Sequence, residues 1–455
     1  MSNPFNPRLS RSLASPWAPR SLVLALLLGA AATAAPAQSL KALYETARGY
    51  DATYQSARMA ADAAGYKANQ TLALNRPKLD AFAALGASDT NIGSNSHGIS
   101  ATAGLELQQS LYNLANQKTI SQSQRAIDVA RAQLVAAEQD LIIRVVQAYF
   151  DILASTDALS TVQASKRFIS EQLASAKRNF EVGTATITDT REAQARFDLA
   201  TAQELAAEND LNVKRLALES LVGRGNLAPK PLAMPVALPG LQPANVEEWV
   251  TQGDGASPGL RQLRLALEVA RLESGKARDG DKPTVGMTAS VSAGHAYSSA
   301  TTRLGSSSGS DSGINASVGV RVTMPLFSGG LIQNRLRETV SLEKKAESDL
   351  EAARRILAQS TRSAYFGVQS LRAQVAALQA AEASSKLALE ATQLGYKVGV
   401  RVNLDVLNAQ SQLNQAQREL AKARYDVLVN SLKLRQVSGV LLPQDVDGID
   451  ALLAP

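Results

Sequence analysis

The stretch NFEVGTATITDTREAQ, residues 179–194, holds the only glycine between Gly104 and Gly223. It lies inside a segment that otherwise has the pattern of a continuous helix. The stretch GYKVGVRVNLDVLNAQ, residues 395–410, resembles it and follows 216 residues later. The same interruption of a long helix therefore occurs twice in the chain.

Gly183 and Gly399 stand at the two interruptions. A glycine in the left-handed conformation commonly ends a helix, so each is predicted to form the turn of a helical hairpin. Asp189, followed by Glu192, has the spacing of a capping box at the start of the next helix, and Asp405 is the matching candidate cap in the second stretch. The two stretches are therefore predicted to be the tips of two helical hairpins.

The similarity extends well beyond the two turns. With a constant offset of 216 and no gap, residues 148–223 align with residues 364–439 at 18 identical positions out of 76, including the tripeptide AYF in both copies. An alignment of this length without insertions indicates an internal structural repeat. The predicted organisation is a first repeat over 38–223, a linker over 224–258, a second repeat over 259–439 and a tail over 440–455.

Proline marks the helical regions. None occurs between Pro77 and Pro229 or between Pro325 and Pro443, and proline costs about 3 kcal/mol inside a helix. The predicted helices cover 40–75, 116–180 and 189–222 in the first repeat, and 260–278, 333–395 and 405–436 in the second. The longest would reach about 100 Å, at about 1.5 Å per residue. The proline-rich linker is predicted to be extended, with one short helix over 246–251.

The first 37 residues have the features of a signal peptide. A positive region with Arg8, Arg11 and Arg20 precedes the apolar stretch 22–32, and the tripeptide APA at 35–37 fits a cleavage site. A membrane-anchoring helix is disfavoured because this stretch is far shorter than the ~20 residues that a span needs. Cleavage after Ala37 removes three arginines, so the formal net charge falls from +6 to +3. This modest charge does not indicate nucleic-acid binding.

Four segments alternate apolar and polar residues as strands do. They lie at 79–88, 99–108, 285–294 and 314–324, and the last alternates strictly. Each is close to the ~9–11 residues with which a tilted strand crosses a bilayer. A soluble antiparallel sheet with one hydrated face has the same pattern. The Gly- and Ser-rich segments between paired strands, and the mostly small, uncharged residues of the polar face, favour membrane strands around a water-filled lumen.

Four membrane strands would have to be completed by other chains. Four strands cannot close a barrel, and each unsatisfied backbone group at an open edge in lipid costs several kcal/mol. The sequence therefore predicts an α+β fold whose antiparallel strands form a transmembrane barrel only on oligomerisation.

Catalytic and metal-binding residue types are scarce. The chain has no cysteine, and its two histidines, His97 and His295, fall in segments predicted to be surface loops. No catalytic, cofactor-binding or metal-binding residues are therefore predicted, and a secreted enzyme is the least favoured function. A periplasmic structural coiled-coil or adaptor protein with a small β-domain is the stronger alternative to a membrane channel.

Several of these features together resemble the TolC family of outer-membrane channel-tunnels. The most specific are AYF in both repeats, FEVGTATITD at 180–189, GYKVGVRVNLDVL at 395–407 and the strand-to-helix junction MPLFSGGLIQNRL at 324–336. The resemblance implies a homotrimer in the outer membrane, with twelve strands, four per chain, continuous with a long-helix α-barrel in the periplasm. It also implies a periplasmic adaptor and an inner-membrane transporter of the ABC or RND type as partners, for multidrug efflux or type I protein secretion.

The resemblance also implies a gate at the hairpin tips. By motif match, Thr188 and Asp189 correspond to the partners of Tyr396 and Arg401 in a latch that holds the periplasmic end closed. Asp405 matches the first acidic position of the pore constriction. The second acidic position is Asn408 in this chain, so the constriction would carry three formal charges per trimer instead of six.

Overall fold

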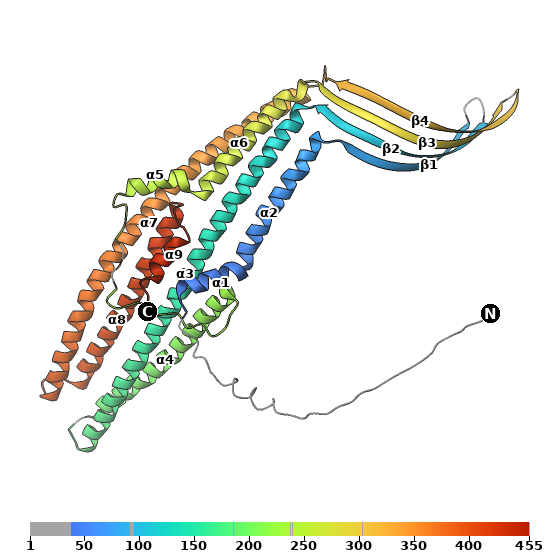
Figure 1. The fold of residues 1–455 in the computed structure, drawn as a ribbon. Coiled ribbons are helices and arrows are strands. Elements are labelled where there is room, and N and C mark those ends of the chain that lie inside the picture. Colours follow the sequence, from blue (N-terminus) through green and yellow to red (C-terminus); the bar gives the residue numbers. More distant parts are fainter. Residues whose placement is uncertain are drawn as a thin grey trace, which may run out of the picture.

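The computed structural model describes residues 38–91, 95–184, 186–236, 238, 240–302 and 304–454. The predicted signal peptide over 1–37 lies outside these residues. Figure 1 shows long helices that run from two hairpin tips at one end of the molecule to a curved sheet at the other. In each repeat, the chain runs out to the sheet, returns through a long helix to a hairpin tip, and then turns back.

The first repeat follows the predicted order of elements. It contains α1 (Leu40–Tyr50), α2 (Ala52–Leu72), η1 (Ala73–Asn75), β1 (Lys78–Asn91), β2 (Asn95–Tyr112), α3 (Leu114–Glu181) and α4 (Ile187–Val222). The long helix α3 has 68 residues, close to the prediction. The prediction of one helix over 40–75 is wrong, because the helix breaks at Asp51.

Asp51 explains that break. Its carboxylate accepts a hydrogen bond from the backbone N–H of Tyr54 at 2.7 Å and so caps α2. Two nitrogens of Arg144 on α3 also donate to this carboxylate, at 2.8 and 3.1 Å. The Arg144 guanidinium lowers the pKa of Asp51, which is buried. The paired charges therefore fasten the start of the repeat to its long helix.

The second repeat has the same order of elements as the first from α2 onward, and it has no counterpart of α1 within its bounds. It contains α6 (Pro258–Arg278), η2 (Asp279–Asp281), β3 (Thr284–Thr302), β4 (Gly305–Thr323), α7 (Leu331–Lys397) and α8 (Asn403–Val437). Helix α5 (Val246–Ala256) precedes it and is longer than the predicted short helix, and α9 (Gln444–Asp450) follows it. The two repeats therefore share one plan, and the segments outside them differ.

The main hydrophobic core lies midway along the molecule. It combines residues of α1, α3, α4 and α8 with Leu227 and Leu232 of the linker and Leu441 and Leu453 of the C-terminal tail. Isolated bridges pair Gln38 with Pro229 and Leu232 with Leu453. The linker and the tail are therefore packed parts of the fold.

The four strands form one antiparallel sheet in the order β1-β2-β3-β4. The strands have 14, 18, 19 and 19 residues, longer than predicted. Much of the Gly- and Ser-rich sequence is strand, because ladder hydrogen bonds use the backbone and do not require large side chains. The prediction that His97 and His295 lie in loops is therefore wrong, since they belong to β2 and β3. His97 Nδ1 lies 3.2 Å from Asp89 Oδ1 on β1.

The register places the alternating apolar residues of all four strands on one face, while Phe82 of β1 lies on the other. Leu79 pairs with Leu107, Leu105 with Val291, and Ala289 with Val318. This face is exposed in the single chain, as Ile314 and Val318 show at 77% each. An apolar surface of this extent has to be covered by lipid or protein.

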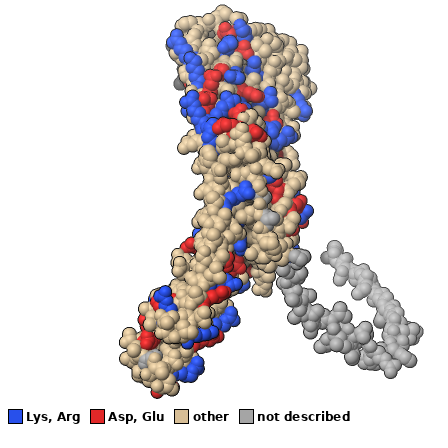
Figure 2. Space-filling view, turned by 90° about the vertical axis from the view of Figure 1, so that its left-hand side faces the viewer, with Lys and Arg blue, Asp and Glu red and all other residues tan. Residues whose placement is uncertain are grey.

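The helices carry charges of both signs. Figure 2 shows Lys and Arg interspersed with Asp and Glu on the face that it presents. Ion pairs between α5 and α7 include Arg354 with Asp254 and Arg362 with Glu247. Within the residues that the structure describes, no helix combines the length and the apolar character needed to cross a bilayer.

Candidate functional site

The two hairpin tips end their first helix in the same way. After α3, the N–H of Gly183 donates to Phe180 O at 3.0 Å and that of Thr184 to Asn179 O at 2.8 Å. After α7, the N–H of Gly399 donates to Tyr396 O at 3.1 Å and that of Val400 to Gly395 O at 2.9 Å. Both are Schellman turns.

Each turn needs a residue with a positive φ. Gly183 has φ 78° and Gly399 has φ 80°, a region that is unfavourable for residues with a Cβ atom. An added Cβ would meet no atom within 4 Å at either position. The backbone conformation alone therefore accounts for glycine at both turns.

The first tip then starts α4 with a complete capping box. The N–H of Asp189 donates to Thr186 Oγ1 at 3.2 Å, and the N–H of Thr186 donates to Asp189 Oδ2 at 2.9 Å. The predicted box of Asp189 with Glu192 is wrong by three residues, because Asp189 is its third helical residue and Thr186 is its cap. Both ends of this tip are therefore closed by local hydrogen bonds.

The second tip starts α8 without such a cap. Val402 stands where the first tip has Thr186, and it offers no side-chain acceptor. Asp405 was a candidate cap, but its carboxylate instead lies 3.5 Å from Arg401 Nη1. Both side chains of this pair are more than one-third exposed, so the pair is held weakly.

Near the tips, two side-chain hydrogen bonds among the described residues join the hairpins. Asn179 Nδ2 donates to the hydroxyl oxygen of Tyr396 at 3.4 Å, and Arg196 Nη2 donates to Asn408 Oδ1 at 3.1 Å. Phe168 and Tyr396 pack beside the buried side chains of Leu389 and Val406. Each of the two hydrogen bonds, Asn179 to Tyr396 and Arg196 to Asn408, joins residues that are more than 200 positions apart in sequence.

The predicted latch residues have other partners within one chain. Asp189 is bound to Thr186, and Arg401 is bound to Asp405. Thr188 is exposed. Among the described residues, no hydrogen bond joins Thr188 or Asp189 to Tyr396 or Arg401. No sequence motif marks Asn179 or Arg196, since their contacts between the hairpins exist only in the three-dimensional structure.

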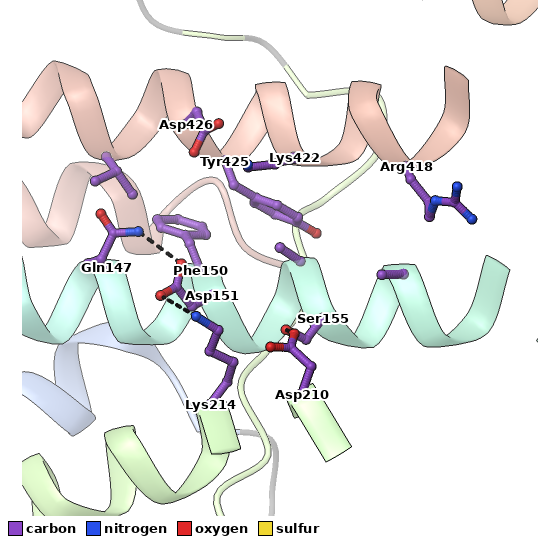
Figure 3. Close-up of a pocket in the computed structure, with 13 residues that line it drawn as sticks. Gln147, Phe150, Asp151, Ser155, Asp210, Lys214, Arg418, Lys422, Tyr425 and Asp426 are labelled. Carbon is purple, nitrogen blue, oxygen red and sulfur yellow. Dashed lines mark hydrogen bonds and ion pairs between the residues drawn. The ribbon is translucent and has the colours of Figure 1, made fainter. Parts of the chain in front are cut away.

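A cavity of about 340 Å³ lies further along the helices, between α3, α4 and α8. In Figure 3, Tyr425 projects from α8 toward α3, and Asp210 projects from α4 toward Ser155. The hydroxyl of Tyr425 donates to Asp157 Oδ2 at 2.6 Å, and burial raises its pKa. No motif in the sequence indicated this cavity.

The chain was compared with protein families and curated proteins. A family model described as "Outer membrane efflux protein" matches residues 43–224 and 252–440. "Outer membrane protein TolC" of Escherichia coli is 29% identical over 442 residues, covering 95% of this chain and 88% of that protein. "Alkaline protease secretion protein AprF" of Pseudomonas aeruginosa is 34% identical over 360 residues, covering 76% of this chain and 71% of that protein.

Solved structures share the fold at lower identity. A structure of CusC has a TM-score of 0.75 and 18% identity, covering 89% of this chain and 92% of that one. The outer membrane protein VceC of Vibrio cholerae has a TM-score of 0.73 and 18% identity, covering 88% and 96%. These structures confirm the TolC-like α+β fold. Since the family model spans both repeats, the chain belongs to the outer membrane efflux protein family.

Proposed function

We propose that this outer-membrane exit duct is a homotrimer whose paired hairpin tips form a gate at the periplasmic end. The observation that carries the proposal is the four-stranded sheet, with an exposed apolar face on all four strands and edges at β1 and β4. Lipid would cover the apolar face, and pairing of β1 with β4 of the next chain would satisfy both edges. Three copies would supply twelve strands.

The duct serves efflux or secretion and lies in the outer membrane, with its helices in the periplasm. Its family and its relatives support this assignment. Within it, we infer a passive conduit without a catalytic step. The energy would come from an inner-membrane transporter of the ABC or RND type, reached through a periplasmic adaptor.

The proposed gate is held by several weak contacts. Within one chain these are the contacts of Tyr396 with Asn179 and of Arg401 with Asp405. We propose that Thr188 and Asp189 complete the latch by meeting Arg401 of the neighbouring chain. Exposed ion pairs contribute only about 0–1 kcal/mol each. Several such contacts together would keep the gate closed, and because each is weak the gate could still open.

A planar-bilayer recording tests this proposal. The double variant Tyr396→Phe, Arg401→Ser should raise single-channel conductance severalfold, because both contacts of the second tip are removed. Lys397→Ser is the matched control, since Lys397 is an exposed cation on the same turn. Equal conductance in the wild type and the double variant would contradict the latch, and absence of any channel from the wild type would contradict the duct.

The constriction is proposed to carry little charge. Asp405 supplies one carboxylate per chain, and Asn408 accepts a hydrogen bond from Arg196. The carboxylate of Asp405 is itself close to Arg401. We therefore propose that the entrance discriminates only weakly between cations and anions.

A further inference from the structure

One aromatic side chain lies on the polar face of the sheet. This face, opposite the apolar one, is here called the lumenal face. The register places Phe82 on it, in one row with Gly104, Ser292 and Asn315. Among the described residues that are paired on this face, every other uncharged residue is Gly, Ala, Ser, Thr, Asn or Gln. Phe82 is therefore the one large apolar group among them.

The neighbours of Phe82 on the lumenal face are small. Gly104 lies directly opposite it, and Ala84 follows it on β1. A larger residue could not replace Gly104 without a shift, since an added Cβ would come within 2.5 Å of Val291 O. Phe82 is 39% exposed in the single chain. Its side chain therefore projects beyond its neighbours into the space that this face borders.

The seam between two chains offers this side chain no large apolar partner. Strand β1 is one edge of the curved sheet in Figure 1, and in the proposed trimer it pairs with β4 of the next chain. On the lumenal face, the paired residues of β4 are Gly, Ser, Asn and Thr, together with Asp311 and Arg321. No register that keeps this face inward buries Phe82 against a large apolar side chain of β4. Phe82 therefore remains available to a molecule in the lumen.

The charged groups near Phe82 do not favour either sign of charge. Lys78 and Asp80 precede it on the same face of β1 and form an ion pair at 2.6 Å. Glu106 lies opposite Asp80, and Arg321 stands near the same end of the sheet, on β4. The formal charges of these four groups sum to zero. The property that distinguishes this part of the lumen is therefore its aromatic surface.

An aromatic side chain in water attracts aromatic and other apolar groups. Contact removes apolar surface from water, and two rings also prefer stacked or edge-to-face geometry. We propose that the three Phe82 side chains of the trimer form an aromatic collar that contacts molecules with aromatic groups as they leave through the lumen. Threefold symmetry places the three side chains at one height. This proposal rests on the proposed trimer and adds a substrate class to it.

Planar-bilayer recordings of the purified trimer measure this contact. The probe is a neutral hexapeptide amide in which serine and tryptophan alternate, and the matched probe has alanine in place of tryptophan. Both are added on the side of the sheet, away from the proposed gate. Individual blockades should last at least about threefold longer with the tryptophan peptide, because only its side chains can stack on the collar.

Variants of β1 locate the contact. Phe82→Ala should abolish the difference between the two peptides, and Phe82→Trp should retain it. Leu85→Ala is the matched control, because it removes a large apolar side chain from the same strand on the opposite face, where Leu85 is 87% exposed. This control should behave as the wild type does. An unchanged difference in Phe82→Ala, or an equal loss in Leu85→Ala, would overturn the proposal.

The temperature at which the trimer dissociates on a gel tests the alternative, a packing role of Phe82 at the seam. The aromatic collar predicts equal temperatures for the wild type, Phe82→Ala and Phe82→Trp. Lower temperatures for both variants, with blockade times unchanged, would overturn the collar in favour of packing. Absence of any channel from the wild type would contradict the duct. Wild-type channels that do not distinguish the two peptides would contradict the collar alone.

Discussion

The tripeptide AYF occurs once in each repeat and has the same local geometry in both. The rings of Tyr149 and Phe150 lie 5.6 Å apart at 81°, and those of Tyr365 and Phe366 lie 5.7 Å apart at 82°. Their surroundings differ. Tyr149 and Phe150 are 0% and 1% exposed, whereas Phe366 is 54% exposed.

Helix α1 and the segments outside the repeats produce this difference. The hydroxyl of Tyr149 donates to Lys230 O in the linker at 2.9 Å, and that of Tyr365 donates to Ala244 O further along the linker. Helix α1, the linker and α9 all contribute to the core around Phe150. The repeat therefore sets the local conformation, while the connecting segments decide which copy becomes the core. In the proposed trimer, the exposed copy is free to meet a neighbouring chain.

Truncation of the two phenylalanines tests this comparison, with the largest expected effect. Phe150→Ala should lower the free energy of unfolding by about 3–5 kcal/mol, because it leaves a buried cavity and removes the ring that stacks on Tyr425. Phe366→Ala should lower the free energy of unfolding by less than half as much, since the Phe366 side chain is already half exposed. Urea unfolding of the two variants measures the ratio. Equal losses would show that the second copy is buried as deeply as the first in the assembled protein.

Exchange of the caps tests the difference between the tips. Thr186→Val should remove the capping box and cost about 1 kcal/mol, whereas Val402→Thr should create a box with Asp405 and add a similar amount. Hydrogen exchange of the first-turn amides should become about fivefold faster in α4 and about fivefold slower in α8. Unchanged exchange in α8 would indicate that Asp405 remains bound to Arg401.

The aspartates Asp210 and Asp426 occupy equivalent repeat positions and give the smallest effect. Because burial raises the pKa of Asp426, its charged form is disfavoured in the folded state. The penalty is complete above the folded pKa and disappears as pH falls below the unfolded value of about 3.9. Asp426→Asn should therefore raise the urea midpoint at pH 7 and leave it unchanged near pH 3. Asp210→Asn, at an exposed carboxylate bonded to Ser155, should give no gain at either pH.

Much of the fold could be predicted because it depends on local pattern. Prolines and glycines bound the long helices to within a few residues, and Gly183 and Gly399 were predicted as turns from backbone preference alone. The break at Asp51 was missed although a local cap forms it, and the ion pair of Asp51 with Arg144 from a distant helix could not be predicted. The strand ends were also missed, because Ser and Gly carry little apolar signal although their backbone groups extend the ladder.

The candidate site was predicted less completely. Tyr396, Arg401 and Asp405 all lie at the second tip, but the pairing of Arg401 with Asp405 was not predicted. Asn179 and Arg196 join the hairpins, and neither had a motif. Contacts of this kind depend on how the two hairpins lie side by side. The residue spacing within one hairpin does not show this arrangement.

The sequence by itself determined the repeat, the long helices, their turns and the alternation that gives the sheet one apolar face, because each follows from preferences of neighbouring residues. Only the tertiary structure decided which AYF is buried, and which tip has a capping box and which an ion pair. Those outcomes depend on residues hundreds of positions apart, and on the linker and tail that pack against the first repeat.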